Sequence, residues 1–270
     1  MSAGNLEHSV SSVKYTRDGY VATLTIDRPE RRNAMSFETL ASLRDGVLRA
    51  RSDRDVRVLV ITGSGDKAFC SGADLGGLRG EGVDAEEAHA GRGHLAELFR
   101  TLWSSGIPTI ARVRGYALAG GFGLAMACDI VIAADDAIFG APEVAVGLWP
   151  YMITVPLVRS MPPKVALELM MTGRRVNADE AQRLGFVNQV VSVDGLDEAV
   201  TRTAEAIAQQ SPSAIRLGRT SFYQTLGTTA DQALPILHAT LSVATATDDA
   251  QEGVSAFAEK RKPTWGGAHE

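Results

Sequence analysis

The stretch TIARVRGYALAGGFGLAMACDIVIAA, residues 109–134, decides the fold class. Residues 109–114 predict a strand, and the apolar run 130–134 is typical of a second, buried strand. Between them the pair Gly120-Gly121 marks a turn that opens a helix of small residues ending near Ala127. Strand, glycine-rich turn, helix and strand in this order predict an α/β fold with ligand sites at the strand ends.

The segments before this stretch follow a similar order. Residues 20–27 predict a strand that ends at Arg28-Pro29, and Ser36 is the expected N-cap of a one-faced helix running to about Arg51. Residues 56–62 are nearly all aliphatic, which favours a strand covered on both faces. The glycine-rich segment 72–93 is expected to be a surface loop, with a more helical stretch after it. Strand signals end near residue 195, and helical ones follow over 196–270.

Composition excludes several classes of partner. The net charge is −5 and no run of basic residues occurs, which argues against nucleic acid or an anionic membrane surface. No apolar run approaches the roughly 18 residues of a spanning helix, and the first twenty residues lack the pattern of a secretory signal. Cys70 and Cys128 lie among apolar or small residues and are expected to be buried thiols. These features predict a cytoplasmic protein.

Two segments predict places where a ligand meets backbone N–H groups. One is AFCSGADL, residues 68–75, and the other is the turn at Gly120, where a helix N-terminus would stabilise an oxygen gaining negative charge. The alternative, that these glycines only permit tight turns and close packing, stays open for each cluster alone. Glu143 lies in an apolar stretch that would raise its pKa and suit it to proton transfer.

These motifs resemble the crotonase (enoyl-CoA hydratase/isomerase) family. The resemblance rests on GYAL before the glycine pair, on ACDI and FGAPE after it, and on AFCSGADL, and it extends from Asp27 to residues 257–261. It implies a spiral of ββα units over 1–195, with the acyl-CoA site, and a C-terminal helical trimerisation region over 196–270 that also closes the site. The expected assembly is a homotrimer or a dimer of trimers.

The resemblance also implies roles for single residues. Ala73 and Gly120 supply the two N–H groups of an oxyanion hole for the thioester carbonyl of an acyl-CoA, and Glu143 moves the proton. The CoA moiety is held by Arg31 and Arg32 beside its phosphates and by Ser71, Asp74 and Leu75 at its adenine end. No metal and no cofactor beyond the CoA moiety of the substrate is implied.

The chain departs from the pattern of a standard hydratase at two places. Gly123 stands where the first of two glutamates is expected, and Trp149, Tyr151 and Met152 replace loop glycines and are expected to shape the acyl pocket. One carboxylate suffices for a double-bond shift, whereas hydration of a 2-enoyl-CoA with one carboxylate is harder. The sequence leaves hydratase and isomerase open, with a non-catalytic acyl-CoA-binding protein as the alternative.

A second acid–base group and the acyl group are the points that the sequence leaves undecided. Tyr151, His94 or Glu97 would serve as a second group if their segments folded over the pocket. For each of the three, surface exposure or core packing is the simpler interpretation.

Overall fold

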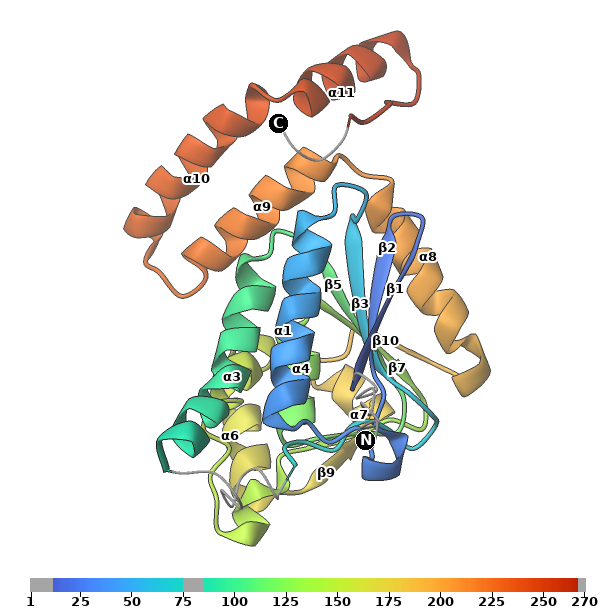
Figure 1. Ribbon diagram of the computed structural model, residues 1–270. Helices are drawn as coiled ribbons and strands as arrows, with labels where there is room; N and C mark the ends of the chain where they lie inside the picture. The colour runs from blue at the N-terminus through green and yellow to red at the C-terminus, as the bar shows by residue number, and fades with distance from the viewer. Residues whose placement is uncertain (1–11, 75–84, 267–270) are drawn as a thin grey trace, which may run out of the picture.

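Two sheets of mainly parallel strands form the centre of the protein (Figure 1). The structure is a computed structural model that describes residues 12–74 and 85–266. The larger sheet has the order β1-β2-β3-β5-β7-β10 and the smaller one β4-β6-β8-β9. The strands are β1 (Val13–Asp18), β2 (Val21–Ile26), β3 (Val58–Gly63), β4 (Ala68–Cys70), β5 (Thr109–Val113), β6 (Tyr116–Leu118), β7 (Ile130–Ala134), β8 (Ile138–Gly140), β9 (Arg175–Asn177) and β10 (Gln189–Val191).

From β3 to β8, consecutive strands alternate between the two sheets. β3, β5 and β7 pair in parallel in the larger sheet, whereas β4, β6 and β8 pair in the smaller one. Along the chain, β3 and β4 are followed by the helix α3 (Ala85–Ser104), and β5 and β6 are followed by the helix α4 (Gly120–Ala127). The predicted α/β class is therefore confirmed, and its repeating unit is ββα.

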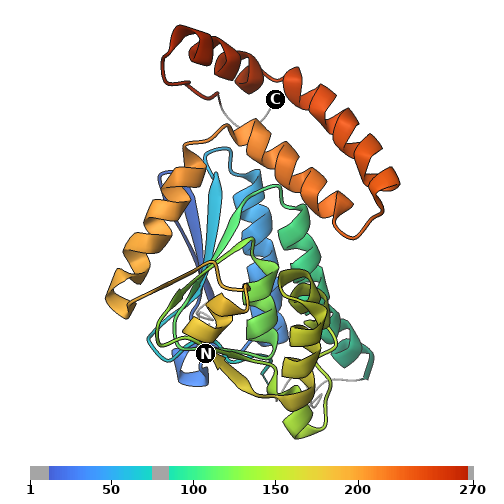
Figure 2. The ribbon, with the colours of Figure 1, turned by 180° about the vertical axis from the view of Figure 1, so that it is seen from behind.

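Helices cover both faces of the larger sheet. On one face α1 (Phe37–Ser52), α3 and α4 enclose the main apolar core, and on the other α8 (Leu196–Ala208) covers a second core that includes Val58 and Ile110 (Figures 1 and 2). The other helical elements are η1 (Pro29–Arg31), η2 (Pro142–Val146), α5 (Thr154–Ser160), α6 (Pro163–Thr172), α7 (Ala178–Arg183), η3 (Val193–Gly195), α9 (Pro212–Thr225), α10 (Ala230–Thr245) and α11 (Asp248–Glu259).

The first long helix begins as its sequence predicts. The Ser36 hydroxyl accepts a hydrogen bond from the Thr39 N–H at 3.2 Å, which satisfies one of the free donors at the start of α1. The expectation of a loop as far as Gly93 was wrong, because α3 already begins at Ala85. A Cβ at position 91 would overlap the Phe37 ring, so Gly91 serves close packing of α3 on α1. Residues 75–84 of the expected loop lie outside the described residues.

The half-buried carboxylate of Asp129 attaches α9 to the sheet. Asp129 Oδ2 accepts hydrogen bonds from the Thr109 N–H and from Arg219 Nε, both at 2.7 Å, and Oδ1 accepts one from the Tyr223 hydroxyl at 2.6 Å. Beyond this point α10 and α11 lie on the side of α9 that faces away from the sheets (Figures 1 and 2), and Asp249 of α11 accepts a hydrogen bond from the Ser213 hydroxyl at 2.7 Å. No residue of α10 is buried. Among the described helices, none has the length and apolarity needed to cross a membrane.

Candidate active site

Two glycines bring the segment after β4 against the segment after β6. Gly72 has a φ of +108°, and a Cβ there would lie 2.7 Å from the Ala119 Cβ and 3.4 Å from the Gly120 nitrogen. A Cβ at Gly121 would overlap the Cys70 carbonyl oxygen. Both glycines therefore permit a backbone contact that a larger residue would prevent. The two segments singled out in the sequence meet at one place.

The N–H groups of Ala73 and Gly120 are available for a ligand at this contact. The Met35 N–H donates to the Gly72 carbonyl and the Asp74 N–H donates to the Met35 carbonyl, so the Ala73 N–H points away from Met35. Gly120 is the first residue of α4, and such an N–H has no partner within its helix. A Cβ at Gly120 would lie 3.7 Å from the Ala73 nitrogen. Two donors thus lie side by side.

Backbone strain is present next to these donors. Ala119 has φ +50° and ψ −126°, a region that residues with a side chain rarely occupy. Such a conformation costs on the order of 1–3 kcal/mol and persists only where the surroundings impose it. Here the Ala119 N–H donates to the Gly140 carbonyl at 2.9 Å, which fixes the turn before α4 against β8.

Glu143 lies in η2, three residues after Gly140, whose carbonyl holds this turn. Its side chain is half-buried, and its Oε2 atom is buried without a hydrogen-bond partner among the described residues. Burial raises the pKa of the Glu143 carboxyl, and a hydrogen bond with its own backbone offsets part of this effect. A carboxyl group whose pKa is raised in this way is suited to take up and return a proton.

The position of the absent glutamate is filled by apolar side chains. A Cβ at Gly123 would overlap Ile153 Cγ2 and would lie 3.2 Å from Phe99 Cζ. Ile153 and Phe99 are both buried. Close packing therefore excludes a carboxylate side chain at position 123 in this structure.

The residues predicted to hold CoA fall on one loop cluster. Arg31 and Arg32 are exposed, and the Ser71 N–H donates to the Arg32 carbonyl at 3.0 Å. Asp74 accepts a hydrogen bond from Arg28 at 3.0 Å, a pairing across the chain that sequence reasoning missed because it gave Arg28 no role beyond the end of a strand. Leu75 lies outside the described residues.

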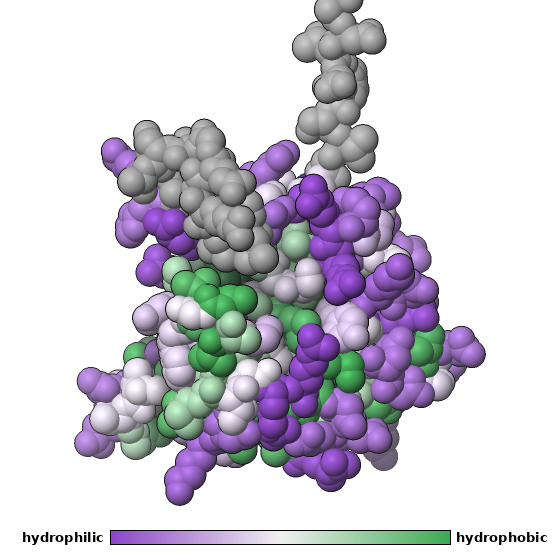
Figure 3. Space-filling model, turned by 90° about the horizontal axis from the view of Figure 1, so that it is seen from below, coloured by the Kyte–Doolittle hydropathy of each residue, from purple (hydrophilic) through white to green (hydrophobic). Residues whose placement is uncertain are grey.

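The residues predicted to shape the acyl pocket follow η2. Trp149 is half-buried against the main core, whereas Tyr151 is 73% exposed and Met152 38% exposed. Apolar side chains gather on the lower end of the molecule (Figure 3), and Val146 and Leu148 of this segment are also exposed.

The three residues considered as a second acid–base group have other surroundings. His94 Nδ1 lies 3.3 Å from the Phe37 carbonyl oxygen, and its ring stands edge-on to the Phe37 ring. Glu97 is exposed and pairs with Arg100 at 3.4 Å. The Tyr151 side chain lies largely in solvent, so none of the three extends into the packing around Gly123.

Comparisons with known proteins identify the family of the chain. Residues 16–268 match the model of the enoyl-CoA hydratase/isomerase family. The chain is 39% identical over 243 residues to crotonyl-CoA hydratase of Syntrophomonas wolfei subsp. wolfei, covering 90% of this chain and 93% of that protein. It is 36% identical over 262 residues to carnitinyl-CoA dehydratase of Proteus mirabilis (strain HI4320), covering 95% and 98%.

Solved structures show the same likeness in three dimensions. The human enoyl coenzyme A hydratase domain-containing protein 3 superposes with a TM-score of 0.89 at 32% identity, covering 94% of this chain and 100% of that one. An enoyl-CoA hydratase of Mycobacterium smegmatis gives a TM-score of 0.89 at 35% identity, covering 94% and 98%. The chain therefore belongs to the enoyl-CoA hydratase/isomerase family, the crotonase family that its motifs resemble, and is an enzyme of that family.

Proposed function

We propose that the protein acts on an acyl-CoA thioester through two backbone N–H groups and a single glutamate. The Ala73 and Gly120 N–H groups would receive the thioester carbonyl oxygen, and Glu143 would move a proton at the α- or γ-carbon. The observation that carries this proposal is the buried, unpartnered Oε2 atom of Glu143 together with the raised pKa of its carboxyl. A functional group left unsatisfied in this way is typical of a catalytic site.

The two N–H groups supply the electrostatic part of the reaction. Removal of a proton from the α-carbon places negative charge on the thioester oxygen, and donors fixed in advance stabilise that charge. One such donor is worth about 10² to 10³ in rate. Glu143, as a carboxylate, accepts the proton, and as a carboxylic acid it returns the proton to the other carbon.

The packing around Gly123 bears on the type of reaction. A double-bond shift needs one group that takes a proton and gives it back, whereas hydration also needs water to be oriented. Ile153 and Phe99 leave no room for a second carboxylate at position 123, which favours the double-bond shift. The relatives named crotonyl-CoA hydratase and carnitinyl-CoA dehydratase favour addition or removal of water. Both classes of substrate therefore belong in the test.

CoA recognition is assigned to the loop cluster beside the donors. The exposed guanidinium groups of Arg31 and Arg32 would pair with the CoA phosphates, for which their geometry is suited. Ser71 and Asp74, with Leu75 next in the chain, would contact the adenine end. The ion pair of Arg28 with Asp74 would hold the carboxylate of Asp74 in place.

Trp149, Tyr151 and Met152 are proposed to border the acyl chain. We expect Trp149→Ala to change the preference for acyl-chain length, because its half-buried indole packs next to the segment that carries Glu143. Kinetics with a series of 2-enoyl-CoA esters of increasing length would measure this preference. An unchanged series would remove Trp149 from the pocket.

A homotrimer or a dimer of trimers is proposed as the assembled form, with the helices after residue 195 as the contact. Leu234, Leu237 and Leu241 lie on one face of α10 and are 63%, 39% and 60% exposed, an apolar surface that a second copy would cover. Light scattering of Leu234→Glu beside the wild type tests this assignment. A cytoplasmic location is also proposed, supported by two free, buried cysteine thiols.

The test of the activity is turnover of crotonyl-CoA, a longer 2-enoyl-CoA and a 3-enoyl-CoA. Hydration of the 2-enoyl esters would establish a hydratase that works with one glutamate. Conversion of the 3-enoyl ester alone would establish an isomerase. Tight binding of all three esters without turnover would contradict the proposal and favour a non-catalytic acyl-CoA-binding protein.

A further inference from the structure

A basic cavity lies at the opposite end of the larger sheet from the candidate active site. Its volume is about 580 Å³, and Arg57 and Pro108 in its wall precede β3 and β5. The candidate site lies after β4 and β6, to which those same strands lead. The cavity is thus separated from Glu143 and Gly120 by the length of the parallel strands.

Charge in this cavity has one sign. Among the described residues its wall contains Arg51, Arg54, Arg57 and Arg216 and no aspartate or glutamate. Asp53 and Asp55 pair with Arg17. Asp249, whose pKa Arg57 helps to lower, lies outside the wall and accepts hydrogen bonds from Ser211 and Ser213. Four guanidinium groups around one space repel one another unless an anion lies between them.

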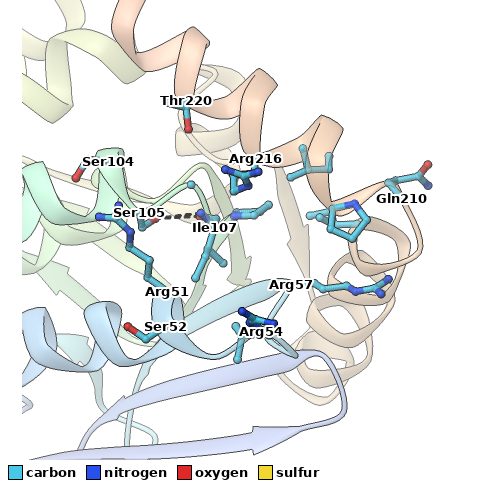
Figure 4. Close-up of a pocket in the computed structure, with 16 residues that line it drawn as sticks. Arg51, Ser52, Arg54, Arg57, Ser104, Ser105, Ile107, Gln210, Arg216 and Thr220 are labelled. Atoms are coloured by element: carbon cyan, nitrogen blue, oxygen red, sulfur yellow. Dashed lines mark hydrogen bonds between the residues drawn. The ribbon is translucent and has the colours of Figure 1, made fainter. Parts of the chain in front are cut away.

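Three of these arginines have free guanidinium groups. The fourth, Arg57, donates to the Ala208 carbonyl at 2.9 Å and lies over the Tyr20 ring. Within residues 12–74 and 85–266, Arg51, Arg54 and Arg216 form no ion pair and donate no hydrogen bond. Figure 4 shows Arg216 reaching from α9 into the space, with Arg51 and Arg54 on the side formed by the end of α1.

Arg216 carries the strongest indication of a missing partner. Its Nε atom is buried and has no hydrogen-bond acceptor in the part of the chain that the structure describes. A Cβ at Gly106 would lie 3.1 Å from Arg216 Cγ, so this glycine allows the stem of the arginine to lie on the loop before β5. A buried donor of a charged group that is left unpaired destabilises the folded protein, and an acceptor on a ligand would remove this cost.

The rest of the wall indicates an organic ligand. Apolar side chains of Val56, Ile107 and Ile215 line the cavity beside the arginines. Arginine pairs bidentately with phosphate, and two or more phosphates are needed to balance three or four guanidinium charges. We propose that this cavity binds a small organic molecule that carries at least two phosphate groups, of the nucleoside diphosphate class.

The test uses the full-length protein and three probes, CoA, ADP and inorganic pyrophosphate. CoA is titrated first by calorimetry to count equivalents, because CoA also carries a diphosphate and an adenosine. If one equivalent binds, ADP and pyrophosphate are titrated with CoA held at saturation, so that the proposed thioester site is occupied. Variants are Arg216→Gln and the exposed Arg54→Gln, with Arg183→Gln on α7 as the matched control away from the cavity.

The expected result is saturable binding of ADP beside bound CoA, weakened about tenfold or more by each cavity variant and unchanged by Arg183→Gln. A second equivalent of CoA that Arg216→Gln abolishes would equally support the site and would identify CoA as its ligand. Pyrophosphate binding without ADP binding would contradict the proposal that the ligand is an organic molecule. No binding of any probe beyond the first CoA, or equal binding by Arg216→Gln, would overturn the proposal, including the case in which a second copy of the chain closes the cavity.

Discussion

Ile153 occupies the space into which a side chain at position 123 would extend. The Cβ of any residue there would overlap Ile153 Cγ2, and the Phe99 ring closes the other side. Gly123→Ala is therefore expected to destabilise the protein by about 1–3 kcal/mol, the usual cost of overpacking a core. In an Ile153→Ala background the same change should cost less, because the space is then open. Urea unfolding of the four proteins in this cycle measures the coupling.

A matched control lies at Gly93 in the same fold. A Cβ there meets nothing within 4 Å, so Gly93→Ala should be neutral or stabilising in helix α3. Equal costs for Gly123→Ala with and without Ile153 would show that the two residues do not compete for space.

The buried carboxyl of Glu143 predicts an effect of pH on stability. Because folding raises its pKa, ionisation of this group lowers the free energy of unfolding as pH rises from the unfolded pKa through the raised folded value. Glu143→Gln should therefore be more stable than the wild type at pH values above the raised pKa, and the difference should shrink as pH falls through the raised pKa toward the ordinary glutamate value. Denaturant unfolding of both proteins across this range gives the difference directly. A constant difference at all pH values would contradict it.

The activity should also depend on the ionisation of Glu143, but it should rise with pH where the stability falls. Glu143 must be ionised to accept a proton, so kcat/KM is expected to fall with decreasing pH around a pKa above that of an ordinary glutamate. A pH profile with a 3-enoyl-CoA or 2-enoyl-CoA substrate measures this limb. An acid limb at or below the ordinary glutamate value would assign the proton transfer to another group.

The hydroxyl of Tyr223 is expected to stabilise the attachment of α9. Its 2.6 Å hydrogen bond to Asp129 has a charged acceptor, and burial raises the pKa of Tyr223 so that the hydroxyl remains protonated. Tyr223→Phe should cost about 1.5–3 kcal/mol of unfolding free energy. Tyr20→Phe is the control and should have little effect, because the ring of Tyr20 is 48% exposed and its hydroxyl forms no hydrogen bond within the described residues. Similar results for the two variants would show that the bond to Asp129 is weak.

Sequence patterns predicted the long elements of the fold, but not the way its short strands pair. The Ser36 cap and the aliphatic run before Gly63 marked α1 and β3, because each contains a full period of its pattern. β4, β6 and β8 span three residues each, which is too short for a periodic signal, so the alternation between two sheets followed only from the family resemblance. The start of α3 was missed because Gly91 reads as a loop residue until Phe37 is placed against it.

The candidate site was predictable where backbone and motif define it and not where packing does. The two glycine-rich segments and Glu143 stood out by residue type alone. Ile153 in place of a carboxylate, the Arg28–Asp74 pair and the network around Asp129 join residues far apart in the chain. Contacts of this kind follow from the folded structure, because no local pattern fixes them.

The central claim is that Glu143 alone exchanges protons with a bound CoA thioester. It is tested most directly by incorporation of deuterium from D₂O into the α- and γ-carbons of crotonyl-CoA and 3-butenoyl-CoA, measured by mass spectrometry for the wild type and Glu143→Gln. The account predicts incorporation by the wild type, and loss of about 10³-fold or more in Glu143→Gln while the affinity for the CoA ester is retained. Undiminished exchange in Glu143→Gln would contradict it and place the proton-transferring group elsewhere in the protein.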